Sequence, residues 1–363
     1  MLHVGAKGGG CFLLLKHDKR NKLRLKQRHL VVLLLCLLLG GTLFFSFSNQ
    51  ITDVISSSSG GEEEPKEEDY IHWVEFNVPL EVLEQAYKYD VESHKKGNVK
   101  LNWIELLAYT AAKNGGAFKK GKKSPTMDAL VERLRSGERL EDITDGMRYW
   151  SYYMEAYTAI LSQFVGEHDE VQDGEPATEY GLKVYSPVAK GYSFGHYDDF
   201  GNPRTYGYKR LHLGNDLCGS IGMPIVAVEG GVVEKLGWNQ YGGWRVGIRS
   251  HDKLRYYYYA HLRKGNPYAE GLQEGSVVRA GDVIGYMGMT GYSTKEDVNN
   301  VKVPHLHFGL QLIFDDSQID GTNQIWIDVY HIVQFLERNR MPVEKLEGGG
   351  YIRADGLAQE VVE

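Results

Sequence analysis

Five side chains that can bind a metal ion or transfer a proton lie in three short motifs of this chain. The motifs are RLHLGND, YYYYAHL and PHLHFGL, and the residues are His212, Asp216, His261, His305 and His307. Alternate residues of a β-strand point to the same face, so both histidines of HLH project to one side. His212 and Asp216 are an even number of residues apart, so an extended segment can aim both inward. Gly214 between them disfavours a helix.

These residue types suit a catalytic zinc site. Such a site keeps three protein ligands and one open position for water or substrate, and two histidines with one aspartate meet that requirement. Zinc held in this way lowers the pKa of its water to about 7 and polarises a carbonyl oxygen. The two remaining histidines can exchange protons with the water and the leaving amine, or hydrogen-bond an oxyanion. Spacing alone does not say which histidine of HLH is the ligand.

Taken in order, HLGND, YAHL and PHLHF resemble the motifs of the lysostaphin-type (LytM-like) zinc metallo-endopeptidases, which hydrolyse peptide bonds of bacterial peptidoglycan. The resemblance covers roughly Tyr185 to Phe314. It extends to GMPIVAVEGGVV, to the glycine-containing stretch that begins at Gly275, and to the GMTGYS run that begins at Gly288.

The resemblance assigns a role to each motif residue. It implies that His212, Asp216 and His307 bind Zn²⁺ and that His261 and His305 are catalytic. It also implies a mainly β catalytic domain, lysostaphin-type or barrel-sandwich-hybrid-like, with antiparallel sheets and a groove. The short apolar or alternating runs between glycine-rich turns agree with an all-β domain.

Two departures from the family pattern affect the expected groove. Family members usually pass from the TGxS turn to the HLHF strand in a few residues, whereas KEDVNNVKV intervenes here before Pro304. We expect this insertion to reshape one wall of the groove. The residue after HLHF, often acidic in relatives, is Gly309.

Three further residues are candidates for substrate contacts. The run YYYYAH has a high β preference, and in a regular strand Tyr257, Tyr259 and His261 share one side. His196 lies upstream of the first ligand, where relatives of the family place groove residues. We therefore predict substrate-binding roles for Tyr257, Tyr259 and His196.

The sequence patterns divide the chain after residue 69 into further segments. Apolar residues at three- and four-residue intervals predict a helical domain before the β domain, and a short amphipathic helix after it. The predicted boundaries are a helical domain at 70–166, a hinge at 167–180, the peptidase domain at 181–325, a C-terminal helix at 326–341 and a loose tail at 342–363.

The helical region has two possible roles. Glu105 is the kind of helical acid that a glycan-cleaving module needs, but no second catalytic motif accompanies it. A spacer, or a region that binds an extracytoplasmic protein partner, is therefore favoured for residues 70–166.

The first 69 residues carry signals for export and anchoring. Residues 30–48 are uncharged and apolar, and as a transmembrane helix they would span roughly 28 Å. A basic segment at 1–29 precedes them and an acidic, serine-rich linker at 49–69 follows. The positive-inside rule then predicts a single-pass protein of the cell membrane with a cytoplasmic N-terminus and an extracytoplasmic catalytic domain. A cleaved signal peptide is the alternative, but its apolar region would be unusually long.

The net charge and the presence of all five motif residues limit the functions that the chain can have. The net charge of −7 argues against nucleic acid as a partner. The resemblance implies a membrane-anchored, zinc-dependent peptidoglycan endopeptidase. The rival is a scaffold of the same fold that binds a partner protein, for example in sporulation or engulfment. Such scaffolds tend to lose ligands, whereas all five polar positions are present here, which favours an enzyme.

Overall fold

A computed structural model of the chain describes residues 70–95, 98–172 and 175–354. The segments predicted at 1–29, 30–48 and 49–69 lie outside the described residues, as do residues 355–363. Within the described ranges, no helix has both the length and the apolar character needed to cross a bilayer.

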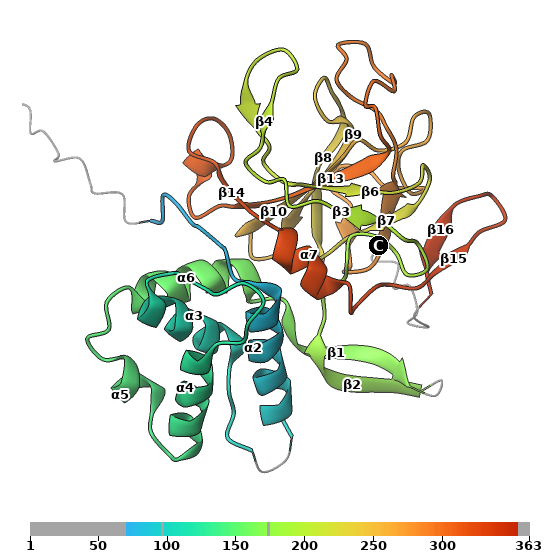
Figure 1. The fold of residues 1–363 in the computed structure, drawn as a ribbon. Coiled ribbons are helices and arrows are strands. Elements are labelled where there is room, and N and C mark those ends of the chain that lie inside the picture. Colours follow the sequence, from blue (N-terminus) through green and yellow to red (C-terminus); the bar gives the residue numbers. More distant parts are fainter. Residues whose placement is uncertain (1–69, 96–97, 173–174, 355–363) are drawn as a thin grey trace, which may run out of the picture. The chain divides into compact units, whose positions relative to one another are not determined.

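In the described part of the chain, five helices precede the β region (Figure 1). Their bounds are α2 (Leu80–Ser93), α3 (Trp103–Asn114), α4 (Pro125–Arg135), α5 (Leu140–Thr144) and α6 (Trp150–Leu161). The Asn102 side chain caps α3 by accepting from the backbone N–H of Ile104, and Ser124 caps α4. α3 ends at Gly115, whose φ of 61° is left-handed. The predicted helical region is confirmed.

The segment predicted as a hinge is instead a regular hairpin. Strands β1 (Val165–Gln172) and β2 (Glu175–Leu182) pair in antiparallel register from Val165 opposite Leu182 to Gln172 opposite Glu175. The charged composition suggested a connecting segment. A two-stranded sheet can carry the same composition, because two strands bury little surface between them.

An eight-stranded antiparallel sheet forms the centre of the β region (Figure 1). Its path runs β11-β8-β9-β10-β13-β6-β3, and β14 pairs with β13. In chain order the strands are β3 (Gly195–His196), β6 (Asn215–Cys218), β8 (Gly231–Asn239), β9 (Gly243–Ser250), β10 (Arg255–Ala260), β11 (Val277–Val278), β13 (His305–Leu312) and β14 (Ile325–Ile327). The predicted mainly β, antiparallel architecture is confirmed.

Smaller elements surround this sheet. They are the ribbons β4 (Pro203–Arg204) with β5 (Arg210–Leu211), β7 (Pro224–Val226) with β12 (Val283–Tyr286), and β15 (Val343–Lys345) with β16 (Tyr351–Arg353), the 3-10 helix at Asp316–Gln318, and helix α7 (Tyr330–Leu336).

The C-terminal predictions at 326–341 and 342–363 need correction. The helix is shorter than predicted because Ile325 and Ile327 pair with β13 as strand β14, so α7 begins only at Tyr330. The tail is not loose as far as Arg353, because β15 and β16 pair as a hairpin and the glycine run 348–350 lies between them.

The helices and the sheet share one hydrophobic core. α7 lies between them in Figure 1, and its Phe335 ring stacks on Trp103 of α3 with ring centroids 5.8 Å apart. Tyr87 of α2 meets the same Phe335 ring edge-on at 5.4 Å. The helical region is therefore packed against the β region and is not a separate spacer.

A buried ion pair also joins the helices to the sheet. The Arg255 side chain at the start of β10 is fully buried. Its Nε donates to Glu229 Oε2 at 2.8 Å, and its Nη1 donates to the carbonyl oxygen of Ala159 in α6 at 2.6 Å. Tyr257 also donates to Glu229, at 2.6 Å. The Arg255 guanidinium therefore neutralises the buried Glu229 carboxylate and hydrogen-bonds the C-terminal part of α6.

Replacing Arg255 with alanine is expected to destabilise the protein by about 3–5 kcal/mol, because the buried Glu229 carboxylate then lacks its counter-charge. The exposed pair Arg133–Glu138 provides the control, and Arg133→Ala should change the free energy of unfolding far less. Urea denaturation measures both variants. Equal losses of stability would contradict this role for Arg255.

Candidate metal centre

Neighbouring strands bring the predicted zinc ligands together. His307 on β13 lies directly opposite Asp216 on β6, and His212 lies in the turn before β6. His212 Nε2 is 2.8 Å from His307 Nδ1 and 3.0 Å from Asp216 Oδ1, and those last two atoms are 3.4 Å apart. Gly214 permits this approach, because a Cβ there would lie 2.9 Å from the His307 ring and 2.5 Å from the carbonyl oxygen of Phe308.

The three atoms fit a zinc ion. Two are imidazole nitrogens and one is a carboxylate oxygen, which is a donor set that zinc enzymes use. Tetrahedral bonds of about 2.1 Å place ligand atoms about 3.4 Å apart, and the separations of 2.8, 3.0 and 3.4 Å seen here are at or somewhat below that value. Asp216 Oδ1 is buried and accepts no hydrogen bond, although imidazole nitrogens surround it. A cation bound at this point would satisfy that oxygen.

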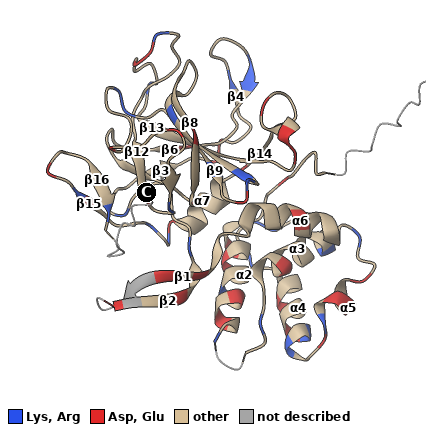
Figure 2. Cartoon of the chain, turned by 180° about the vertical axis from the view of Figure 1, so that it is seen from behind, with Lys and Arg blue, Asp and Glu red and all other residues tan. Residues whose placement is uncertain are grey.

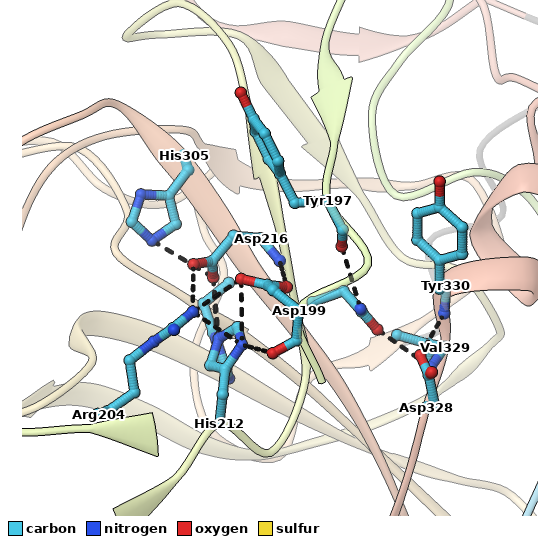
Figure 3. Close-up of polar contacts among 11 residues, drawn as sticks. Tyr197, Asp199, Arg204, His212, Asp216, His305, Asp328, Val329 and Tyr330 are labelled. Carbon is cyan, nitrogen blue, oxygen red and sulfur yellow. Dashed lines mark hydrogen bonds and ion pairs between the residues drawn. The ribbon is translucent and has the colours of Figure 1, made fainter. Parts of the chain in front are cut away.

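The environment of His212 fixes its orientation. Its Nδ1 lies 3.0 Å from the carbonyl oxygen of Asp199 and 3.3 Å from that residue's Oδ2 (Figure 3). A proton on Nδ1 donated to that carbonyl leaves the Nε2 lone pair for a metal. Burial lowers the pKa of His212, but the neighbouring carboxylates of Asp199 and Asp216 outweigh burial and raise it to about 9. Two carboxylates therefore stabilise positive charge at this position.

Arg204 holds the second oxygen of the aspartate ligand. Its Nη2 lies 3.1 Å from Asp216 Oδ2 and 2.7 Å from Asp199 Oδ2 (Figure 3). The pairing of β4 with β5 places Arg204 here, opposite Arg210 in register. Sequence analysis missed Arg204 and Asp199. Their only signal is an aspartate and an arginine within DDFGNPR, upstream of HLGND.

Arg204→Gln is expected to weaken zinc binding by about 10- to 100-fold, because Asp216 loses the donor that fixes its carboxylate. Lys209→Gln removes a neighbouring exposed cation and should leave the affinity unchanged. A competition titration against a chromogenic zinc chelator gives both dissociation constants. An unchanged dissociation constant for Arg204→Gln would show that this contact does not orient the carboxylate.

The two predicted catalytic histidines lie beside the ligands and share one arrangement. His261 Nδ1 is 2.7 Å from the carbonyl oxygen of Thr290, and His305 Nδ1 is 2.8 Å from that of Val303. Each Nδ1–H can donate to its carbonyl, which leaves each Nε2 free to accept a proton. The ring centroids are 4.7 Å apart. Burial, followed by the neighbouring histidines, holds the pKa of His261 well below its usual value, so this imidazole is neutral.

The prediction that Tyr257 and Tyr259 line the groove is wrong. Both side chains are buried in the core, and Tyr256 and Tyr258 line the cavity instead. The strand ends at Ala260, and His261 has a left-handed φ of 61°, so the strict alternation stops before the histidine. His261 consequently shares a side with the even-numbered tyrosines.

The prediction for His196 is also wrong. In β3 it lies opposite Leu217, which is fully buried, and so on the side of the sheet away from Asp216. Its ring packs on Tyr330 of α7 with centroids 4.6 Å apart. Burial lowers the pKa of His196 to about 4. The residue does not line the cavity.

A cavity of about 490 Å³ opens beside the predicted metal ligands. His212, His261 and His307 contribute to its lining, as do Tyr258 and Trp326. Gly309 leaves room for this wall, because a Cβ there would lie 2.9 Å from the Trp326 ring. A larger side chain at this position would not fit without a shift of the Trp326 ring.

The insertion KEDVNNVKV does not form the expected wall of the groove. None of residues 295–303 lines the cavity. Asp297 instead accepts hydrogen bonds from Trp244 Nε1 and from the backbone N–H of Gly265, both at 2.8 Å. The insertion is therefore fastened to the strand and turn that flank His261.

Comparisons with known proteins agree with this geometry. The model of peptidase family M23 matches residues 210–320. The L-Ala–D-Glu endopeptidase of Bacillus subtilis is 35% identical over 165 residues, which is 44% of this chain and 47% of that protein. Lysostaphin of Staphylococcus simulans is 36% identical over 132 residues, 36% of this chain and 23% of that protein. The chain thus spans less than half of either relative.

A solved structure of the lysostaphin catalytic domain from Staphylococcus simulans is 34% identical, covers 35% of this chain and 85% of that chain, and has a TM-score of 0.27. The matched range 210–320 contains all five motif residues. Residues 210–320 are therefore similar to a peptidase family M23 domain.

Proposed function

We propose that the chain is a zinc-dependent endopeptidase that hydrolyses peptide bonds of bacterial peptidoglycan outside the cytoplasmic membrane. The observation that carries the proposal is the convergence of His212 Nε2, Asp216 Oδ1 and His307 Nδ1 on one point beside a cavity. Relatives named as L-Ala–D-Glu endopeptidase, lysostaphin and peptidoglycan DD-endopeptidase support the substrate class.

The ligand residues supply one negative charge to the metal. His212 and His307 bind as neutral imidazoles and Asp216 as a carboxylate, so a bound zinc site keeps a net positive charge. When bound, zinc supplies Lewis acidity that lowers the pKa of water and polarises a carbonyl.

His261 and His305 transfer protons in the proposed reaction. Their Nδ1 atoms are tied to backbone carbonyls, so proton exchange takes place at His261 Nε2 and His305 Nε2. Either atom can take a proton from the attacking water and return it to the leaving amine, and in its protonated form can donate to an oxyanion. A neutral His261 is in the correct state to accept a proton first.

The anchored location is part of the same proposal. A span at 30–48 with basic residues before it would hold the N-terminus in the cytoplasm and the M23 domain outside, where peptidoglycan lies. The scaffold alternative is not favoured, because the ligand and proton-transfer residues are all present and lie together.

Product analysis tests the proposal. The full chain, loaded with zinc, is incubated with muropeptides that contain glycyl bridges, direct cross-links or uncrosslinked stem peptides. We expect mass spectrometry to find cleavage of one type of peptide bond, lost on chelation and restored by zinc. Intact muropeptides in every case, with zinc bound, would contradict an endopeptidase.

A further inference from the structure

The cavity beside the metal ligands has an excess of positive charge. Its lining includes five cationic side chains and only two carboxylates: Arg204, Arg210, Lys235, Arg245 and Arg249 against Glu234 and Asp320. Lys and Arg positions are visible on β4 and β9 in Figure 2. A cavity of this kind favours an anionic ligand.

Within the described ranges, two of these five cations form ion pairs with carboxylates, and the other three, which include Lys235, do not. Arg204 pairs with Asp199 and Asp216, and Arg249 pairs with Glu234 at 2.7 Å. Among the residues that the structure describes, no carboxylate forms an ion pair with Arg210 or Arg245. These two guanidinium groups therefore keep an uncompensated charge that an anionic ligand can neutralise.

Arg245 lies in the same cross-strand row as the metal ligands. β10 pairs Ala260 with His307, and β9 pairs Val246 with Tyr259, so Arg245 follows beside Ala260. Neighbouring strands lie about 4.8 Å apart, and two such spacings separate Arg245 from His307, so the two backbones are about 10 Å apart. Arg245 Nε is buried and has no hydrogen-bond partner. A buried donor without a partner is rare, and a ligand oxygen would satisfy it.

Aromatic rings hold Arg210 over the same cavity. Its guanidinium lies 4.9 Å from the ring centre of Tyr241 and 5.4 Å from that of Tyr292. Nη1 donates to the carbonyl oxygen of Tyr206 at 2.9 Å. The stacked guanidinium is thereby oriented, and its remaining N–H groups can donate to a ligand.

We propose that Arg210 and Arg245 bind a free carboxylate of the peptide substrate close to the scissile bond. The arginine fork matches the two oxygens of a carboxylate. The inference rests on the proposed function and specifies its substrate class: acidic peptides, such as stem peptides with a free glutamyl or diamino-acid carboxylate. Uncharged glycyl bridges would leave both arginines without a partner.

Binding to the zinc-free full chain tests the subsite without depending on catalysis. Three synthetic stem peptides are compared by calorimetry: one with all carboxylates free, one with the D-glutamyl α-carboxylate amidated, and one with the diamino-acid carboxylate amidated. We expect one amidation to weaken binding by about 10- to 100-fold, which identifies the recognised carboxylate. Equal affinity for all three peptides would overturn the proposal.

Variants connect this preference to the two arginines. The double variant Arg210→Gln/Arg245→Gln should bind the free and the amidated peptides equally, whereas Lys209→Gln should keep the wild-type preference. The variant Arg210→Lys/Arg245→Lys keeps both positive charges and should keep part of the preference for the free peptide. This result would distinguish charge recognition from misfolding. A preference that persists in the glutamine variant would overturn the assignment.

The outcomes also separate this inference from the proposed function. If the preference holds but zinc-loaded protein cuts no peptide, the carboxylate subsite stands and the endopeptidase proposal fails. If the protein cuts free and amidated peptides with equal kcat/KM and binds them equally, the endopeptidase stands and the subsite fails.

Discussion

Replacing His305 with alanine is expected to lower peptide hydrolysis by about 100- to 10,000-fold while zinc stays bound. The side chain is oriented by Val303, and its Nε2 lies 3.5 Å from Asp216 Oδ1, at the edge of the ligand set. It is therefore placed to transfer protons, and the three predicted ligands are complete without it. Hydrolysis rates and zinc content are to be measured on the same preparation.

The control for this variant is His251→Ala, which removes an exposed histidine at a turn. It should leave both the rate and the zinc content unchanged. Wild-type turnover in His305→Ala would exclude a proton-transfer role, and loss of zinc from it would show that this residue is a ligand.

Replacing Asp216 with alanine is expected to abolish zinc binding and hydrolysis together. Asp216 is the only anion in the predicted ligand set, and its Oδ1 lies 3.0 Å from His212 Nε2 and 3.4 Å from His307 Nδ1. Without Asp216, the predicted site loses both its only negative charge and one of its three metal ligands. We expect the zinc dissociation constant to rise by more than the about 10- to 100-fold typical of residues that only orient a ligand.

Asp216→Asn separates charge from shape at this position. It keeps a carbonyl oxygen and the volume of the side chain but not the negative charge, so zinc binding should be intermediate between wild type and Asp216→Ala. Zinc content and hydrolysis equal to wild type in Asp216→Ala would contradict a ligand role.

The cluster of candidate metal ligands was predictable because its signals are local in the sequence. Each of the motifs HLGND, YAHL and PHLHF contains one or two of the five candidate residues. Strand β13 pairs with β6, so His307 lies opposite Asp216. The spacing of HLH correctly predicted a strand, which is β13. Helices α3 and α4 were predictable for a similar reason, because their capping residues are close in sequence to their apolar faces.

The errors arose where distant contacts override local pattern. Alternation along YYYYAH assigned Tyr257 and Tyr259 to the groove, but the left-handed backbone of His261 ends the alternation. The C-terminal helix was predicted to begin at residue 326, yet Trp326 and Ile327 pair with β13 as part of a strand.

Residues outside the motifs were missed for a related reason. Arg204 reaches Asp216 only because β4 pairs with β5, and Arg245 joins the site only through the register of three strands. Neither residue belongs to a short motif, so its role becomes visible only in the fold.

The central claim is that one zinc ion is bound by His212, Asp216 and His307. X-ray absorption at the zinc edge, combined with metal analysis of the purified full chain, tests it most directly. We predict one zinc per chain, with two imidazole nitrogens and oxygen ligands, and loss of that signal in Asp216→Ala. A chain that binds no zinc, or that keeps the same zinc environment without Asp216, would contradict the account.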